Sequence, residues 1–229
     1  MTRASDAHRW ADQLDDLLAR IAPARIAPGF ARLEPRRRAG ASLQGRLAPL
    51  EGKNGWPLAE AAGDAPPDGM QDFLSRVPWD ADAGRDDLRA DAVEPLGDPE
   101  AVRVLDETGF LTTGDQSVGV QRPSSGTAGR IEPCPIGVFL AYASRQGHAR
   151  IDRALDLPET WAADAARRAE AGVPEEISFT PKPKLGQAML KRAFAAGVPC
   201  AFVSATASLG PTTRPAASSR RAAADPCGR

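Results

Sequence analysis

The stretch AVRVLDETGFLTTGDQSVGVQR, residues 101–122, decides how this chain is interpreted. Its apolar start, residues 101–106, predicts a β-strand that ends at the carboxylate of Asp106. A glycine-rich turn follows, and residues 117–122 predict a second strand. Asp106 therefore has two interpretations. It is either a turn residue at a strand end, where Asp and Gly are common, or an acid that holds a metal ion.

The composition fits a globular protein of one or two domains. The chain has 229 residues, is 42% hydrophobic and carries a net charge of −1, so it lacks a general basic signal for nucleic acid. Its three cysteines are far apart and form no C-x-x-C pair, so neither a zinc site nor a disulfide framework is indicated. No apolar run approaches the roughly 18 residues of a membrane-spanning helix. We therefore expect a cytoplasmic protein without a membrane partner.

Helical periodicity prevails in residues 1–96. Within residues 5–21 the apolar side chains recur at three- and four-residue intervals, at Trp10, Leu14, Leu17, Leu18 and Ile21. The tandem ARIAP, at 19–23 and again at 24–28, follows as a local duplication. Further helices are predicted after Glu34, after Pro57, within PPDGMQDFLSRV and over about residues 80–94, where Pro95 is expected to end the last one.

The pattern changes to strands from residue 101 onward, and the second predicted domain begins at residue 97. Residues 136–143 and 149–157 would extend an antiparallel meander, and two helices are expected at 159–172 and 184–197. The apolar run at 198–204 predicts a strand buried on both faces. A right-handed crossover would lay that strand parallel to the first one. The predicted class is α/β (α+β), with a helical region before the first part of a ribonuclease-H-like core at 97–204.

This topology gives Asp106 a chemical context. Cutting or joining a phosphodiester requires charge stabilisation on the attacking and the leaving oxygen, which two Mg²⁺ ions roughly 4 Å apart can provide. Magnesium prefers hard oxygen ligands, so such a site requires several carboxylates. Asp106 supplies one. The others are expected on the adjacent strand and on a later helix.

Longer motifs carry a resemblance to a known family. The blocks DETGF (106–110), SVGVQR (117–122), SGTAGRIE (125–132) and IGVFLAY (136–142) together resemble the DDE transposases of bacterial insertion sequences, and in particular their seven-oh-one family. The resemblance covers roughly residues 10–204. It implies that Asp106 is the first acid of a DDE triad and binds Mg²⁺. It also implies a DNA-contacting helical region and strand cleavage and transfer at transposon ends.

The resemblance also identifies the partners and the DNA contacts to expect. Transposon-end DNA is the implied partner, together with further copies of the chain or a full-length transposase. Phosphate contacts require Arg and Lys side chains. The candidates in this sequence are Arg36, Arg37, Arg38, Lys53, Arg122 and Arg130.

The chain departs from the family pattern at the second acid. The family places it in a T-G-D-x-x-Y-G motif after the buried strand, whereas this chain reads SATASLG and has Thr206 at the position of the Asp. The third acid, a Glu, is expected beyond residue 229. We expect this copy to be truncated and catalytically inactive.

A frameshift near Ser204 would explain this departure. The codons GGC GAC GGC GTC encode Gly-Asp-Gly-Val, and read one base later they begin Ala-Thr-Ala-Ser, the sequence of residues 205–208. Residues 205–229 are rich in Ala, Arg and Pro without an apolar period, so we expect a disordered, out-of-frame tail. A gene in which no shifted frame continues with a Gly-Asp motif would contradict this hypothesis.

Two other functions remain open. A truncated transposase that binds DNA without cutting it would inhibit the full-length enzyme. A haloacid-dehalogenase-like phosphatase would use Asp106 as its nucleophile and Ser204 after the second strand. That phosphatase would need a second Asp two residues after Asp106, where this chain has Thr108.

Overall fold

The computed structural model describes residues 29–64, 66–112, 117–121 and 134–209. The chain divides into two compact units, the first ending at Leu88 and the second beginning at Arg89. The predicted helix over 5–21, Arg122, Arg130 and the sequence after residue 209 lie outside the described residues. The predicted domain division after residue 96 stays a prediction.

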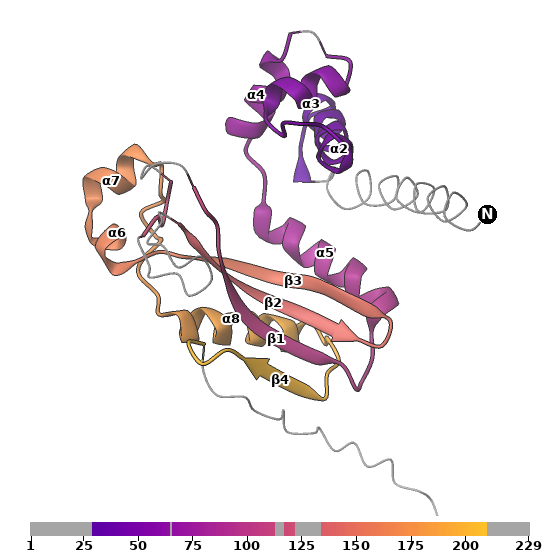
Figure 1. Ribbon diagram of the computed structural model, residues 1–229, viewed down its shortest axis with the longest axis vertical. Helices are drawn as coiled ribbons and strands as arrows, with labels where there is room; N and C mark the ends of the chain where they lie inside the picture. Colours follow the sequence, from indigo (N-terminus) through magenta and orange to yellow (C-terminus); the bar gives the residue numbers. More distant parts are fainter. Residues whose placement is uncertain (1–28, 65, 113–116, 122–133, 210–229) are drawn as a thin grey trace, which may run out of the picture. The chain divides into compact units, whose positions relative to one another are not determined.

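The described elements come in blocks along the chain, as Figure 1 shows: helices α2 to α5, strands β1 to β3, helices α6 to α8 and the final strand β4. They are α2 (Leu33–Leu47), α3 (Gly55–Ala61), α4 (Asp68–Ser75), α5 (Ala81–Leu96), β1 (Val102–Gly109), β2 (Ile136–Ser144), β3 (Gly147–Asp156), α6 (Glu159–Ala163), α7 (Ala165–Glu170), α8 (Lys182–Ala195) and β4 (Phe202–Ala205).

The first unit is a small helical cluster, as the sequence predicts. Helices α2, α3 and α4 pack around Leu58, Ala59 and Met70, all of which are buried. Asn54 caps α3, because its side chain accepts a hydrogen bond of 3.0 Å from the backbone N–H of Trp56. Neither α2 nor α4 has a side-chain cap at its N-terminus, so the packing around these buried residues is what holds the three short helices.

The second unit is built on a four-stranded mixed sheet in the order β3-β2-β1-β4. The pairs β1–β2 and β2–β3 are antiparallel, whereas β1–β4 is parallel. This confirms the predicted meander and crossover strand, and the mixed α/β class. Helix α8 lies between β3 and β4 in the sequence and packs against one face of the sheet (Figure 1).

The two faces of the sheet differ in cover. Leu105 of β1 faces α8, where a Cβ on Gly186 would lie only 3.0 Å from the Leu105 side chain. Leu140, Tyr142 and Met189 join this core and are fully buried. Residues alternate along a strand, so Asp106 lies on the opposite face. Its cross-strand neighbour there is Phe139.

The prediction of a strand at 117–122 is wrong for the described part. Residues 117–121 form a turn with a single antiparallel bridge between Gln121 and Cys134. The physical reason lies at Gly119, which adopts a φ of +75°. Strand residues have negative φ, so this left-handed conformation interrupts any ladder.

Three predicted element boundaries also shift. The expected helix at 159–172 is two helices, because Asp164 is extended and caps α7 through the N–H of Arg167, at 3.0 Å. Pro95 lies inside α5 instead of ending it. The apolar strand predicted at 198–204 is limited to β4, at the edge of the described sheet, and its Phe202 is 45% exposed. Only one face of that strand is buried.

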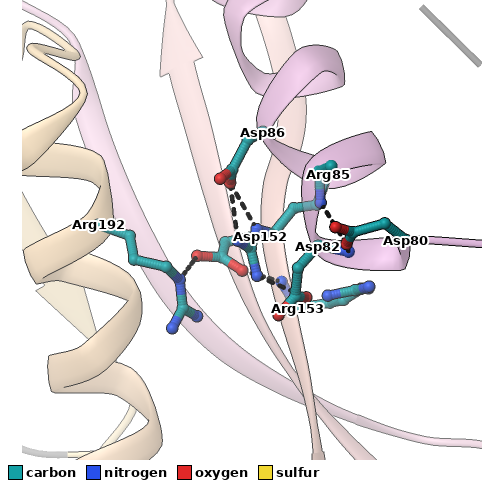
Figure 2. Close-up of polar contacts among 8 residues, drawn as sticks. Asp80, Asp82, Arg85, Asp86, Asp152, Arg153 and Arg192 are labelled. Atoms are coloured by element: carbon teal, nitrogen blue, oxygen red, sulfur yellow. Dashed lines mark hydrogen bonds and ion pairs between the residues drawn. The ribbon is translucent and has the colours of Figure 1, made fainter. Parts of the chain in front are cut away.

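Buried ion pairs connect the second unit's core to its surface. Arg192 of α8 donates to the fully buried carboxylate of Asp152 on β3 at 2.9 Å, as Figure 2 shows.

In the first unit, Arg85 of α5 pairs with Asp82 at 2.8 Å and with Asp86 at 2.7 Å. These α5 pairs are short-range helix contacts of the kind that contribute a few tenths of a kcal/mol.

Asp98 fixes the segment just before β1 through several hydrogen bonds. Its carboxylate accepts hydrogen bonds from the N–H of Glu100 at 2.8 Å and from Arg145 at 3.1 Å. Its own backbone N–H donates to the hydroxyl of the buried Tyr142, at 2.9 Å. The Glu100 N–H, followed by Arg145, lowers the pKa of the Asp98 carboxyl below its ordinary value.

Arg103 is a cation inside the core. Its side chain is completely buried, stacks on the ring of Phe194 at 4.2 Å and donates to the carbonyl of Val198. Its Nε and one terminal nitrogen are buried without a hydrogen-bond partner among the described residues. Burial therefore lowers the pKa of the guanidinium.

The first prediction concerns acid stability. Because the pKa of Asp98 is lower in the folded chain than in the unfolded one, its stabilising contribution is present above about pH 4 and is lost as pH falls further. We expect Asp98→Asn to lower the melting temperature at pH 6 and to flatten its decline between pH 5 and pH 3. Glu100→Gln, at the exposed neighbour, is the matched control. An unchanged acid profile in Asp98→Asn would show that this carboxylate does not contribute.

The second prediction concerns Arg103. Replacing a poorly compensated buried charge by an apolar side chain of similar length is expected to raise the free energy of unfolding by about 1 kcal/mol or more. Arg103→Met should show this in urea unfolding, while Arg103→Lys, which keeps a buried charge, should be less stable than the original chain. If Arg103→Met is less stable than the original chain, the buried guanidinium is not a net cost.

Candidate functional site

Asp106 lies on β1, on the sheet face that α8 does not cover. Its side chain is exposed, and its Oδ1 accepts a hydrogen bond from the N–H of Glu107 at 2.8 Å. It is therefore accessible to a ligand from solvent. The predicted end of the strand at Asp106 is wrong, because β1 continues to Gly109 and pairs with β2 along its whole length.

Thr206 lies beside Asp106, because the parallel β1–β4 pairing continues past the end of β4. Leu105 pairs with Ala205, and the backbone N–H of Thr206 donates to the carbonyl of Leu105 at 3.2 Å. Continuing this register by one step places Thr206, the residue after β4, opposite Asp106. The two positions that the family pattern assigns to the first and second acid are brought together.

Thr206 presents a hydroxyl instead of a carboxylate at this position. The side chain is exposed, and its Oγ1 lies 3.3 Å from the hydroxyl of Ser208. A threonine hydroxyl is neutral and has one oxygen, whereas an ionised Asp offers two oxygens and a full charge. The site therefore lacks half of the charge that the predicted pair of acids would supply.

Glu107 does not compensate for this loss, although it is the residue after Asp106. It lies on the α8 face, and its carboxylate pairs with Lys182 at 2.6 Å. The same Lys182 ammonium lies 3.8 Å from Asp156, which also accepts from Gln121 at 3.2 Å. Glu107 and Asp156 thus belong to a separate cluster behind the strand that holds the start of α8 against the sheet.

The donor set around Asp106 does not fit a two-magnesium centre. Such a centre requires several carboxylates on one side, and the described residues place only Asp106 there. Among these described ranges, no group of three His, Cys, Asp or Glu side chains could hold a metal ion. The predicted metal role of Asp106 therefore remains an inference from the family.

An aromatic and cationic cluster on the Asp106 face was missed by the sequence analysis. Phe139, the cross-strand neighbour of Asp106, contacts Phe110 edge to face with ring centroids 6.0 Å apart. The guanidinium of the exposed Arg150 lies 4.5 Å from the centre of the Phe139 ring. Aromatic and arginine surfaces of this kind bind nucleic acid bases and phosphates. Alternation within the predicted strands could have placed Phe139 on one face, but not beside Asp106.

The predicted basic residues of the first unit have different environments. Arg36 donates to the carbonyl of Phe30 at 2.7 Å. Arg38 pairs with Glu34 at 2.7 Å and lies against Gly69, which has no side chain to displace it. Lys53 donates to the carbonyls of Gly45, at 3.2 Å, and Ala48 at the end of α2. These three side chains hold the helical cluster together.

Arg37 differs from its neighbours. Its side chain is exposed on α2, and no contact of its charged group occurs within the described residues. Of the predicted phosphate contacts in the described ranges, it is therefore the one whose charge is available. Arg122 and Arg130 fall outside those ranges.

None of the described helices is both long and apolar enough to cross a membrane.

Comparison with known proteins identifies the family. The family model described as DDE superfamily endonuclease matches residues 25–214, which is most of the chain. No curated protein and no solved structure matches it. The matched region includes α2 to β4 and contains both Asp106 and Thr206. The chain thus belongs to the DDE superfamily endonucleases, and its function is of the nuclease or transposase type.

Proposed function

We propose that this chain derives from an insertion-sequence transposase of the seven-oh-one type and binds DNA without cutting it. The observation that carries the proposal is the hydrogen bond from the N–H of Thr206 to the carbonyl of Leu105, which extends the β1–β4 register to the position opposite Asp106. Members of the family act on DNA, usually with a divalent metal ion, so a change at this position affects the chemical step and leaves the binding surfaces unchanged.

The number of carboxylates limits the chemistry that this site can perform. Among the described residues, Asp106 is the carboxylate on this face that could hold a metal ion, because Glu107 is engaged with Lys182. In-line displacement at phosphorus requires stabilisation of both the entering and the leaving oxygen, and each 1.36 kcal/mol lost from that stabilisation slows the reaction tenfold. With a single carboxylate, we expect neither stable Mg²⁺ binding nor strand cleavage.

Binding rests on two surfaces that do not involve the missing acid. Arg37 presents an available charge on α2, and Arg150 lies over Phe139 on the face of the sheet that carries Asp106. Phosphate contacts from such side chains provide affinity independent of sequence. A chain that retains them would occupy transposon ends and compete with a full-length transposase, which is the inhibitory role left open above.

The phosphatase alternative receives no support from the fold. It requires a second acid two residues after Asp106, where Thr108 stands, and a helix directly after the first strand. Here β1 runs to Gly109 and pairs antiparallel with β2 instead.

The third prediction tests the charge argument. The chain, at micromolar concentration with Mg²⁺ or Mn²⁺, should nick supercoiled plasmid no faster than Asp106→Ala. Thr206→Asp adds the second carboxylate, so we expect measurable Mn²⁺ binding by calorimetry that Asp106→Ala abolishes. Thr206→Asn, similar in size but neutral, is the matched control and should not bind Mn²⁺. Nicking by the unaltered chain that depends on Asp106 would overturn the proposed loss of cleavage.

The fourth prediction tests DNA binding. Fluorescence anisotropy with a labelled duplex at several salt concentrations should show binding that weakens with salt. Arg37→Ala and Arg150→Ala should each weaken it and reduce the slope of log K against log salt by about one, the value for one lost phosphate contact. Arg76→Ala removes an equally exposed charge that pairs with Asp72 at 3.5 Å, and it is the control. Equal losses in all three variants, or a binding curve independent of salt, would contradict these assignments.

A further inference from the structure

The helical first unit contains an apolar groove that the described residues leave open. The groove encloses about 430 Å³ and lies between α2, α4 and the segment after α4. Phe30, Leu43, Phe73, Leu74 and Trp79 form its apolar lining, and Arg46 contributes the one charged side chain. We use the name apolar groove for this set.

The aromatic side chains of the apolar groove are already arranged around one residue. Phe30 is buried, and its ring lies 5.6 Å from that of Phe73 and 6.3 Å from that of Trp79, centre to centre. Trp79 nevertheless remains 51% exposed, and Leu74 remains 39% exposed. Large apolar side chains gathered at one hollow, with their outer sides open, mark a surface that another apolar element covers.

The sequence offers an element of matching form directly before this groove. Residues 5–21 predict a helix with Trp10, Leu14, Leu17, Leu18 and Ile21 on one narrow stripe. The chain then needs only residues 22–29 to reach Phe30. Fully extended, that connection spans up to about 26 Å, which equals the length of a 17-residue helix. The predicted helix can therefore fold back along the groove.

Residues 5–21 and helix α2 carry opposite net charges. Residues 5–21 contain four aspartates and two arginines. Helix α2 contains four arginines and one glutamate. Asp15 lies three residues before Leu18, beside the apolar stripe, where it would meet the basic side of the groove at Arg46.

We propose that residues 5–21 form a helix that packs its apolar stripe into the apolar groove, so that the chain's own N-terminal segment completes the helical unit. Burial of Trp10 and the leucines against Phe73, Leu74 and Trp79 would provide the driving force. Attraction between the aspartates of residues 5–21 and the arginines of α2 would set the direction in which the helix lies in the groove. The inference concerns the assembly of the first unit and is independent of the DNA-binding proposal.

Disulfide trapping in the full-length chain tests this packing. With Cys134, Cys200 and Cys227 replaced by Ser, the pair Leu14→Cys and Leu74→Cys should form an intramolecular disulfide under mild oxidation. Asp12→Cys lies on the opposite side of the predicted helix and, paired with Leu74→Cys, should cross-link much more slowly. Equal rates for the two pairs, no cross-link in either, or mainly intermolecular cross-links, as expected if a second copy fills the groove, would each overturn the proposal.

Hydrogen exchange provides a second test that does not depend on new cysteines. In the double variant Leu14→Gln and Leu17→Gln, the amides of α4 should exchange about tenfold faster, while those of β1 to β3 stay unchanged and report an intact sheet. The matched control, Asp12→Gln with Asp16→Gln, alters the polar side of the same helix and should leave α4 as it is. No change in α4 for the leucine variant would refute the packing.

Discussion

The parallel pairing of β4 with β1 is the constraint on which the second unit depends. It is made by backbone hydrogen bonds that begin where the N–H of Ala201 meets the carbonyl of Ala101, at 2.8 Å, and extend to Thr206 beside Leu105. A parallel neighbour requires a crossover, and α8 provides it while covering the core face of the sheet. Gly186 permits this cover because a side chain there would collide with Leu105.

The same pairing determines the chemistry of the site. Its register places the residue after β4 beside Asp106, regardless of what that residue is. In this chain it is Thr206, and two other acids of the described region belong to other contacts. Glu107 and Asp156 face Lys182 behind the strand. A scaffold that still assembles this position, with a neutral side chain in it, is the physical basis of our proposal that the chain binds DNA without cutting it.

The sequence was sufficient for the features that depend on local pattern. Apolar runs located β1 and β2, and the handedness of crossovers predicted the parallel placement of β4. It failed where one backbone conformation decides the outcome. The φ of +75° at Gly119 prevents the predicted strand at 117–122, and the extended Asp164 divides one expected helix into α6 and α7.

Some candidate site residues follow from local sequence, whereas their contacts depend on the three-dimensional structure. Asp106 and Thr206 were selected from the motif, since the motif contains both positions, and their roles stay predictions. The engagement of Arg38 and Lys53 could not be found in this way, because it depends on Gly69 and on the carbonyls at the end of α2. The neighbourhood of Asp106, Phe139 and Arg150 also required the strand register, which no single stretch of sequence contains.

The register of β1 and β4 can be measured directly in solution. In a background without the native cysteines, the pair Asp106→Cys and Thr206→Cys should form a disulfide readily, because neighbouring strands place their Cα atoms within the range of about 4.4–6.8 Å that disulfides require. Asp106→Cys with Ser204→Cys, one step back on the same face, should not. Preferential cross-linking to position 204 would contradict the register, and with it the proposal that Thr206 replaces the second acid beside Asp106.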